Sequence, residues 1–379
     1  MPWSVTLLVG ADEHVFTGPA AGVLGRDRVC SIRVATDEKV SRRHCAFDVD
    51  PPLLSVRDLG SRNGTFVNGA RVTGDQELKD GDELRAGDTT IRVEVRAEPV
   101  AGLRVIRELG RGGQGVVHLA RHATTGELVA VKTLTAQGEI DPAARTAFVR
   151  ELDCTKALRH DNIVRFRDSF ADPLCFTCEY CAGGSVADLV RHRGGRLPPS
   201  EAVPLALQAL DGLAYAHQAP VPVRLADGTT TTEHGLVHRD IKPQNLLLAE
   251  TGLKIADFGL AKAFDKAGLS GHTFTGAMGG SIAFMPRQQI VDYKYATPDV
   301  DVWAITACLY WMLTGTTPHD FPPRADPIAI VLRQRPVAIR ERLDTVPARL
   351  AGLIDHTLDE PPTSATALAD ALQLAHPAR

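Results

Sequence analysis

The side chains best suited to chemistry lie in a short run of mixed charge, His238-Arg239-Asp240-Ile241-Lys242-Pro243-Gln244-Asn245, with Asp257 following further along the chain. Phosphoryl transfer needs a carboxylate beside the hydroxyl that is phosphorylated, oxygen ligands for metal ions, and cations that neutralise the transferred group. Asp240 can supply the first of these and Lys242 the last. Asn245 and Asp257 offer the oxygen ligands. This pattern predicts a phosphoryl-transfer site.

A glycine-rich string lies upstream between two apolar runs and reads Gly110-Arg111-Gly112-Gly113-Gln114-Gly115-Val116-Val117. Glycines allow a tight strand–turn–strand whose backbone amides approach phosphates closely. Further along, Lys132 stands at the end of an apolar strand-like run. Its predicted partner is Glu151, on the amphipathic segment 143–158. The two features predict a second set of phosphate contacts for the same site.

Another group of polar residues collects at predicted turns in the first part of the chain: Arg26, Ser41, Arg42, Arg62 and Asn63. Guanidinium groups, a hydroxyl and an amide together make a suitable cradle for a phosphate dianion. Because a β-sandwich gathers its loops at its two ends, these turns can converge on one ligand. For any one of these residues taken alone, an ordinary exposed loop position is the better explanation of its presence.

Two kinds of structure must position these side chains. Residues 1–96 contain short alternating apolar runs separated by Gly, Asn and Asp turns, which predicts a β-sandwich. Beyond residue 105, strand-like runs continue to about residue 179, and helical segments such as 201–217 and 299–313 follow. We therefore predict an all-β domain over 1–96, a short linker over 97–102 and an α+β domain over 103–377. At about 3.3–3.6 Å per residue the linker spans roughly 20 Å at most, so the domains are expected to stay close.

Composition and charge exclude several classes of protein. The 379 residues include 44% hydrophobic and 23% charged residues, which is ordinary for a globular chain of two or three domains. The 42 Lys and Arg against 46 Asp and Glu give a formal charge of −4, whereas a general nucleic-acid binder carries a basic surplus. No apolar stretch reaches the roughly 20 residues of a membrane helix, and no basic region precedes the apolar run at 5–9. With seven scattered cysteines, typical of reduced thiols, we expect a cytoplasmic protein that binds neither nucleic acid nor membrane.

From residue 103 to about 375 the chain resembles a eukaryotic-type protein kinase domain, through the glycine-rich string, Lys132, the run around Asp240, and Asp257-Phe258-Gly259. The resemblance implies a bilobal fold, with a small lobe over about 103–180 and a large lobe over about 181–377. It also implies ATP and Mg²⁺ as cofactors. By position, Asp240 would orient and deprotonate the substrate hydroxyl, and Asn245 and Asp257 would hold Mg²⁺.

The kinase resemblance assigns roles to further residues. Lys132 would contact the α- and β-phosphates and be held by Glu151, while Lys242 would neutralise the γ-phosphate, as is typical of serine/threonine kinases. Residues 179–181 would be the hinge against the adenine, with Cys178 as gatekeeper, and Asp301 would brace the catalytic loop. The nucleotide contacts that it implies are Gly110, Gly112, Gly115, Val117, Ala130, Lys132, Glu179 and Cys181.

Residues 1–96 resemble the forkhead-associated (FHA) domain, through Gly25-Arg26, Ser41-x-x-His44, and Asn63-Gly64 with Asn68. The resemblance implies that Arg26 and Ser41 bind the phosphate of a phosphothreonine peptide. Arg42 and Arg62 would assist them, and Asn63 would hold the peptide backbone. His44 and Asn68 look like scaffold residues that fix the loops.

Arg239, directly before Asp240, indicates regulation, because a phosphate on the activation loop can neutralise this arginine and order that loop. We favour Thr273 and Thr275 as the phosphorylation sites. Ser281 occupies the position of the family's threonine that bonds to the catalytic loop, so we do not expect it to be a regulatory site.

The sequence departs from the kinase pattern at Pro286-Arg287-Gln288, where the family has Ala-Pro-Glu. The arginine that usually pairs with that glutamate is missing from 359–365 as well. One missing partner would leave a buried charge unpaired at a cost of about 3–5 kcal/mol, whereas losing both leaves none. We therefore predict a fold that tolerates the change, a looser substrate-docking region, and a lower melting temperature for Gln288→Glu.

Between His217 and His238 the chain is longer than the family usually allows. The extra stretch covers about 219–233 and includes Asp227-Gly228, which predicts a surface hairpin. The sequence indicates no function for it.

The leading hypothesis is a protein serine/threonine kinase with a fused phosphothreonine reader, regulated by activation-loop autophosphorylation. Its partners would be protein substrates and phosphothreonine-containing proteins. These could include its own activation loop in a second copy, since the short linker disfavours reading within one molecule. The alternative is a pseudokinase scaffold that binds phosphothreonine partners without phosphoryl transfer. The altered segment 286–288 is its only support, because every predicted phosphate and metal position is filled.

Overall fold

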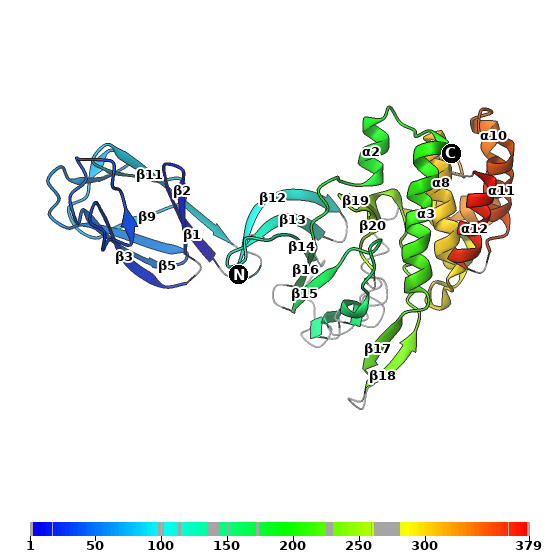
Figure 1. Ribbon diagram of the computed structural model, residues 1–379, viewed down its shortest axis with the longest axis horizontal. Coiled ribbons are helices and arrows are strands. Elements are labelled where there is room, and N and C mark those ends of the chain that lie inside the picture. Colours follow the sequence, from blue (N-terminus) through cyan, green and yellow to red (C-terminus); the bar gives the residue numbers. More distant parts are fainter. Residues whose placement is uncertain are drawn as a thin grey trace. The chain divides into compact units, whose positions relative to one another are not determined.

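The computed structural model describes residues 3–16, 18–97, 100, 102–112, 115–134, 145–146, 148–149, 152, 154–171, 174–224, 230–258, 260, 281–362 and 364–376. The chain forms two compact units, Met1–Arg107 with His118–Leu128, and Glu108–Val117 with Val129–Arg379. This division follows packing and cuts through three strands, so the domain limits at 1–96, 97–102 and 103–377 stay predictions. Figure 1 shows the elements of each unit.

The N-terminal region folds as two sheets that are antiparallel except for one strand pair, which confirms the predicted all-β fold. The first sheet has the order β2 (Asp12–Phe16), β1 (Trp3–Val9), β11 (Thr89–Ala97), β10 (Glu83–Ala86), β7 (Thr65–Val67) and β8 (Ala70–Arg71). The second has the order β4 (Ile32–Arg33), β3 (Ala20–Gly25), β5 (Cys45–Asp50), β6 (Leu53–Asp58) and β9 (Gln76–Leu78), in which only the β3–β4 pair is parallel. Side chains alternate between faces, so β5 buries Cys45, Phe47 and Val49 in one core with Leu54 and Ile91.

The small lobe of the second region contains a five-stranded sheet. Its order is β12 (Leu103–Gly112), β13 (Gly115–His122), β14 (Leu128–Leu134), β16 (Leu174–Glu179) and β15 (Phe166–Ala171). A short 3-10 turn, η1 (Cys154–Ala157), follows the segment in which residues 145–152 are described in part. Val129, Ala130 and Val131 are buried on β14, and the next residue of the strand, Lys132, is buried with them at 8% exposed.

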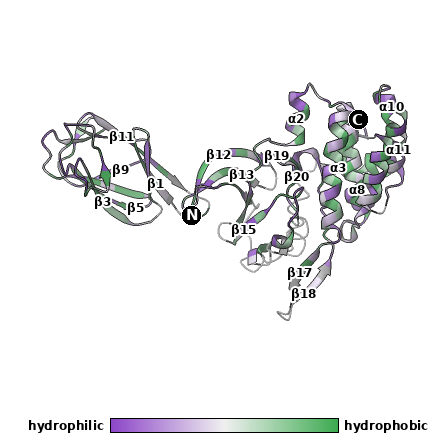
Figure 2. Cartoon of the chain, in the orientation of Figure 1, coloured by the Kyte–Doolittle hydropathy of each residue, from purple (hydrophilic) through white to green (hydrophobic). Residues whose placement is uncertain are grey.

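The large lobe is mainly helical, as predicted. Its helices are α2 (Val186–His192), α3 (Pro199–Ala216), α7 (Arg287–Val291), α8 (Asp299–Thr314), α9 (Pro327–Arg333), α10 (Ile339–Arg342), α11 (Ala348–Asp359) and α12 (Ala365–Ala375). Buried residues occupy nearly every position of α8, so this helix forms the centre of the lobe, whereas α3 carries both hydrophobic and hydrophilic residues (Figure 2). The predicted helices at 201–217 and 299–313 correspond to α3 and α8.

Short elements of the large lobe follow Asp240 and Lys242 along the chain, and of the predicted site residues they contain Asn245, at the end of the first element. They are η2 (Pro243–Asn245), β19 (Leu246–Ala249), β20 (Gly252–Ile255), η3 (Ile282–Phe284) and η4 (Tyr293–Tyr295). The extra stretch after α3 forms an antiparallel hairpin of β17 (Pro220–Arg224) and β18 (Thr230–His234), which confirms the prediction, although its turn at 225–229 lies outside the described residues. Among the helices that the structure describes, none is both long enough and apolar enough to span a bilayer.

Candidate catalytic and phosphate-binding sites

Asp301, on the first turn of α8, fixes the backbone of the predicted catalytic loop. Its side chain is 1% exposed. Its Oδ1 accepts the backbone N–H of Arg239 at 2.9 Å, and its Oδ2 accepts that of His238 at 2.8 Å. The same Oδ2 lies 2.8 Å from Nε2 of His217, at the end of α3. The two long core helices thus hold the loop between them.

Asp240 and Lys242 form an ion pair on this loop. Nζ of Lys242 donates to the two oxygens of Asp240 at 3.1 and 2.9 Å, and to Oγ of Ser281 at 2.9 Å. Nδ2 of Asn245 donates to the backbone oxygen of Asp240 at 2.8 Å and to its Oδ2 at 3.2 Å. The side chains of Asp240 and Lys242 are 25% and 21% exposed, so a substrate hydroxyl can reach them. Ser281 bonds to the catalytic loop, as the sequence predicts.

Lys132 and Asp257 link the two lobes across the predicted nucleotide site. Nζ of Lys132 lies 2.6 Å from Oδ2 of Asp257, and the two side chains are 10% and 22% exposed. Asp257 has a φ of 63° and Arg239 a φ of 65°, in the left-handed region that non-glycine residues rarely adopt. Such conformations concentrate at functional sites, where the surrounding contacts hold them in place. Glu151, the predicted partner of Lys132, lies outside the described residues.

Asn245 and Asp257 can each offer an oxygen to a divalent cation. Asn245 turns its amide nitrogen towards Asp240, and Asp257 uses Oδ2 for Lys132. Within the part of the chain that the structure describes, Oδ1 of each residue has no recorded partner. Carboxylate and amide oxygens are the ligands that Mg²⁺ takes together with substrate phosphates. The residues present therefore fit the predicted metal.

The glycine-rich string lies where β12 ends and β13 begins. Gly115 has a φ of 149°, and a Cβ there would lie 2.1 Å from the backbone oxygen of Thr133, so only glycine fits. A Cβ at Gly110 or Gly112 would meet no described atom within 4 Å. Packing therefore does not require these two glycines, and the open space leaves their backbone accessible to a phosphate group. Residues 113–114 lie outside the described part of the chain.

The predicted hinge begins where β16 ends, at Glu179. The Glu179 carboxylate lies 2.9 Å from Nζ of Lys254, which fixes the start of the segment. Among the described residues, no acceptor is recorded for the backbone N–H of Cys181, so this group can pair with an adenine nitrogen. Burial raises the pKa of the Cys181 thiol to about 11, so it stays protonated at neutral pH. Of the remaining predicted nucleotide contacts, Ala130 is buried and Val117 is half-buried.

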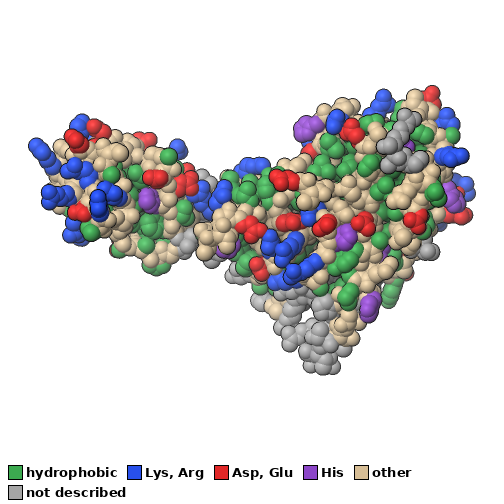
Figure 3. Space-filling model, in the orientation of Figure 1, with side chains coloured by type: hydrophobic (Ala, Val, Ile, Leu, Met, Phe, Trp, Pro, Cys, Tyr) green, Lys and Arg blue, Asp and Glu red, His purple; other side chains and the backbone are tan. Residues whose placement is uncertain are grey.

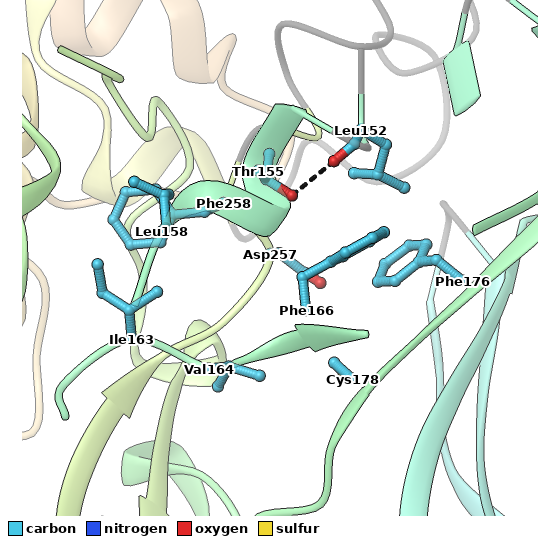
Figure 4. Close-up of a pocket in the computed structure, with 10 residues that line it drawn as sticks. All are labelled: Leu152, Thr155, Leu158, Ile163, Val164, Phe166, Phe176, Cys178, Asp257 and Phe258. Carbon is cyan, nitrogen blue, oxygen red and sulfur yellow. Dashed lines mark hydrogen bonds between the residues drawn. The ribbon is translucent and has the colours of Figure 1, made fainter. Parts of the chain in front are cut away.

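A small cavity lies behind Cys178, the predicted gatekeeper (Figure 4). Its volume is about 30 Å³, and its walls include Asp257 and the stacked rings of Phe166 and Phe176, whose centroids are 5.7 Å apart. Burial raises the pKa of the Cys178 thiol, so this side chain stays uncharged at neutral pH. A cavity of this size holds about one water molecule and is too small for a nucleotide.

The five predicted phosphopeptide contacts lie on three loops of the N-terminal sandwich, and Ser41 joins these loops. The backbone oxygen of Ser41 accepts the N–H of Arg26 at 3.0 Å, and its Oγ accepts the N–H of Arg62 at 3.0 Å. Nδ2 of Asn63 donates to the backbone oxygen of Lys39 at 2.8 Å, two residues before Ser41. Ser41 is half-buried, whereas Arg26, Arg42, Arg62 and Asn63 are exposed. Figure 3 shows Lys and Arg side chains gathered at one end of this sandwich.

His44 and Asn68 both act as scaffold residues, His44 for the loops of Ser41 and Asn63 and Asn68 for the turn before β10. His44 is completely buried; its Nδ1 accepts the N–H of Ser41 at 3.0 Å, and its Nε2 lies 3.1 Å from the backbone oxygen of Gly64. Since Nδ1 is the acceptor, Nε2 carries the proton and donates to Gly64. Asn68 has a φ of 48° and bonds to Asp82 and the N–H of Glu83, both at 2.9 Å.

Sequence reasoning missed Asp58, at the end of β6. Its Oδ1 accepts the hydroxyls of Ser61 and Thr65, both at 2.6 Å. Its Oδ2 accepts the backbone N–H groups of Gly60 and Ser61, at 2.9 and 3.0 Å. Burial tends to raise the pKa of Asp58, but the hydrogen bonds from Ser61 and Thr65 outweigh it and lower the pKa. A single carboxylate therefore shapes the turn that presents Arg62.

The region of the altered segment 286–288 differs from expectation. Gln288 is exposed, so a glutamate there would be solvated, and the predicted drop in melting temperature for Gln288→Glu loses its physical basis. The next residue, Gln289, is 2% exposed, and its Nε2 donates to the backbone oxygen of Arg239 at 2.6 Å. Sequence reasoning missed this bond, because nothing in the helix sequence Arg287-Gln288-Gln289-Ile290-Val291 distinguishes the buried Gln289 from the exposed glutamine before it.

Several predicted residues cannot be compared with the structure. Thr273 and Thr275, the predicted phosphorylation sites, lie outside the described residues, as does Glu151. Arg239, the residue expected to sense a phosphate, is half-buried, and its guanidinium carbon lies 5.9 Å from the ring centre of Tyr293. Regulation by phosphorylation of this loop stays a prediction.

Comparison with known families agrees with the two resemblances. The protein kinase domain family matches residues 103–375, and the FHA domain family matches residues 22–87. Serine/threonine-protein kinase cds1 of Schizosaccharomyces pombe is 29% identical over 343 residues, which cover 81% of this chain and 71% of that protein. The carbon catabolite-derepressing protein kinase of Candida albicans is 32% identical over 228 residues, covering 59% of this chain and 33% of that protein.

A bacterial relative shows the same similarity. Serine/threonine-protein kinase pkn2 of Myxococcus xanthus is 28% identical over 288 residues, which cover 73% of this chain and 32% of that protein. The matched region thus spans about a third of the length of two of these three relatives, while it spans most of cds1.

Proposed function

This chain belongs to the protein kinase family and carries an FHA domain, and we propose that it transfers the γ-phosphate of ATP to serine or threonine of protein substrates while its FHA domain binds phosphothreonine peptides. The single observation that supports the transfer best is the cluster around Asp240. The Asp240 carboxylate accepts hydrogen bonds from Asn245 and Lys242, and its side chain is still 25% exposed. The serine/threonine-protein kinase relatives support the choice of hydroxyl substrate.

We propose that Asp240 accepts the proton of the substrate hydroxyl. A carboxylate within hydrogen-bond reach of a hydroxyl orients the attacking oxygen and removes its proton as the bond to phosphorus forms. Asn245 holds Asp240 in this orientation through two hydrogen bonds from its amide nitrogen, at 2.8 and 3.2 Å. The Asp301 brace keeps the loop backbone fixed, so little reorganisation is needed when substrate binds.

The two lysines supply positive charge on opposite sides of the proposed nucleotide site. Lys242 would neutralise the γ-phosphate, since its ammonium lies within 3.1 Å of both Asp240 oxygens and so lies beside the reacting hydroxyl. Lys132 would contact the α- and β-phosphates, with Glu151 as its proposed partner. Asn245 and Asp257 would hold Mg²⁺, which neutralises phosphate charge when it is bound with the nucleotide.

The N-terminal loops are proposed to bind phosphothreonine through Arg26 and Ser41, with help from Arg42 and Arg62. The Ser41 hydroxyl oxygen accepts the N–H of Arg62, which leaves its proton for a phosphate oxygen. Asn63 uses its nitrogen for Lys39, so its Oδ1 is the atom that would accept from the peptide backbone. That its substrates are proteins follows from the kinase family. We propose in addition that the FHA domain binds the phosphorylated activation loop of a second copy of the chain.

Radiolabelled ATP tests the transfer. The wild-type chain should label itself or a generic protein substrate, and Asp240→Asn should reduce the rate about 10²–10⁴-fold. Asp344→Asn, which changes an exposed carboxylate of the large lobe, is the matched control and should retain the wild-type rate. Equal rates for wild type and Asp240→Asn would exclude the assigned base. The pseudokinase alternative predicts no transfer in any of them, and the residues and family matches give it no support.

Mass spectrometry after incubation with ATP tests the regulatory part. Phosphate on Thr273 or Thr275 in the wild-type chain, and its absence in Asp240→Asn, would support autophosphorylation of the activation loop. A loop that stays unmodified while a protein substrate is labelled would exclude it.

A further inference from the structure

A groove of about 550 Å³ lies on the large lobe, between α7, the start of α8 and the end of α11. Gln288 and Val291 of α7 line one side, and Asp359 and Pro361 line the other. Trp303 of α8 is 4% exposed, and its Nε1 donates to the backbone oxygen of Leu358 at 2.9 Å. This bond joins α8 to the end of α11, so the shape of the groove is built into the core of the lobe.

The groove exposes apolar surface. Val291 and Tyr295 both line it, and each is 70% exposed. Among the large hydrophobic side chains that the structure describes in this lobe, only Leu374 is comparably exposed. Contiguous apolar surface with a polar rim marks an interaction site more often than scattered exposed residues do. The volume lies within the range of about 300–1,000 Å³ that is typical of ligand-binding clefts.

The charge of the groove selects the partner. Three carboxylates line it, those of Asp292, Asp299 and Asp359, against the single guanidinium of Arg287. For the described part of the chain, no ion pair is recorded for Asp292 or Asp359, and both are exposed. The surplus of negative charge attracts lysine or arginine and repels a phosphate group. An apolar floor with an acidic rim fits a segment that contains both kinds of side chain.

The groove is connected to the catalytic loop by one turn of helix. Gln288 of α7 lines the groove, whereas the next residue, Gln289, is buried and donates to the backbone oxygen of Arg239 at 2.6 Å. Asp240 follows Arg239 directly. A segment bound in the groove therefore contacts the helix that also holds the loop of the proposed base.

From these contacts we propose that the groove is a docking site for protein substrates that carry an unphosphorylated segment of basic and bulky apolar residues, separate from the serine or threonine that is phosphorylated. This inference rests on the proposed kinase function, because the partner is a substrate only if the chain phosphorylates it. The segment places an arginine or lysine between Asp292 and Asp359 and an apolar side chain against Val291 and Tyr295. Docking raises the local concentration of the acceptor serine or threonine, so it lowers KM.

A binding experiment tests the site without requiring catalysis. The probe is a short fluorescent peptide of arginines and leucines without hydroxyl residues, measured by anisotropy against the full chain carrying Asp240→Asn. Its counterpart with glutamate in place of arginine should not bind. Adding Asp292→Lys and Asp359→Lys should weaken binding of the basic peptide about tenfold, and adding Val291→Ser should weaken it a fewfold. Since all three positions are exposed, the variants should fold, and Asp344→Lys is the matched control outside the groove.

A kinetic experiment tests the link to substrates. Fusing the same basic segment to an acceptor peptide should lower KM about tenfold with kcat unchanged, and the double lysine variant should lose this gain while phosphorylating the unfused peptide normally. Binding that ignores the groove variants would overturn the proposal. Equal binding of an arginine peptide without leucine would also overturn it, because the groove would then be a simple cation site. A dimer that the variants dissociate would overturn it as well, because the occupant would then be a second copy of the chain. Groove-dependent binding, together with a wild-type chain that shows no kinase activity, would retain the docking site and refute the proposed function.

Discussion

The two phosphate-handling sites of this protein are organised in opposite ways. In the N-terminal sandwich, the arginines proposed to bind phosphate are exposed, and backbone hydrogen bonds fix their loops, such as the one from Arg26 to Ser41 at 3.0 Å. In the kinase domain, the charged side chains are largely buried and fix one another, as Lys132 does with Asp257 at 2.6 Å and Lys242 with Asp240 at 2.9 Å.

This difference separates binding from stability in one site and couples them in the other. Side chains that only point outward from a rigid loop can be removed without a loss of folding free energy. Side chains that serve as each other's partners leave a buried polar group unsatisfied when one is removed, and their effects do not add. The reader should therefore tolerate substitution of its exposed arginine contacts, whereas substitutions in the catalytic loop should lower both activity and stability.

Asp301→Asn should have the largest effect on stability. The amide keeps the shape of the carboxylate but places an NH₂ group against a backbone N–H and removes the charge beside His217. Leaving such groups unsatisfied costs about 1–3 kcal/mol each. We expect the melting temperature of the kinase domain and the rate of phosphoryl transfer to fall together. Thermal unfolding and the radiolabelled assay, with Asp344→Asn as control, measure the two effects.

An Asp301→Asn variant that lost activity at an unchanged melting temperature would contradict this coupling. The buried carboxylate would then act on catalysis alone, and the contrast between the two sites would disappear.

Arg26→Ala should have a large effect on binding and almost none on folding. Losing a charge-assisted hydrogen bond to phosphate costs about 1.5–3 kcal/mol, which corresponds to a loss of affinity of roughly 10- to 100-fold for a phosphothreonine peptide. The melting temperature should stay within the range of a surface substitution, because the N–H of residue 26 still bonds to Ser41. Calorimetry with phosphorylated and unphosphorylated forms of one peptide measures the affinity.

The neighbouring Arg28→Ala is the matched control, since Arg28 is exposed on the same loop but is not a predicted contact. Equal affinity of Arg26→Ala and wild type would show that the phosphate binds elsewhere.

Asp58→Asn should destabilise the sandwich by about 1–3 kcal/mol, because the carboxylate accepts four hydrogen bonds in the turn before β7. The pKa of folded Asp58 lies below its ordinary value of 3.8, so its contribution is present above that pH. It is lost as the pH falls through the lowered pKa. As the buffer is taken from pH 7 to pH 3, the wild type should keep its advantage over the variant in urea unfolding until the pH falls below 3.8, and lose it progressively from there.

A constant difference between wild type and Asp58→Asn over this range would exclude the carboxylate as the cause. Phosphopeptide affinity measured at neutral pH tells whether the turn, once weakened, still presents Arg62.

Much of the fold and of both sites followed from sequence, because the informative residues are close together in the chain. The strand alternation of β5, the glycine-rich string and the run around Asp240 each carry their signal within a few residues. Asp58 and Gln289 gave no such signal, since their importance depends on which distant backbone atoms they meet. The groove could not be predicted for the same reason: it forms where α7 packs near the end of α11, about seventy residues further along the chain.

The smallest expected effect concerns Gln288→Glu, at a position that belongs to neither kind of site. Gln288 is exposed, and no hydrogen bond of its side chain is recorded within the described ranges, so the new carboxylate stays hydrated. We expect the free energy of unfolding to change by no more than about 0.5 kcal/mol. The carboxylate adds to the negative charge of the groove, so binding of the basic peptide should strengthen slightly while transfer to an unfused acceptor stays the same. A clear drop in melting temperature would instead show that residue 288 is buried in solution, and the coupling between side chains seen at Asp240 would then extend to the docking groove.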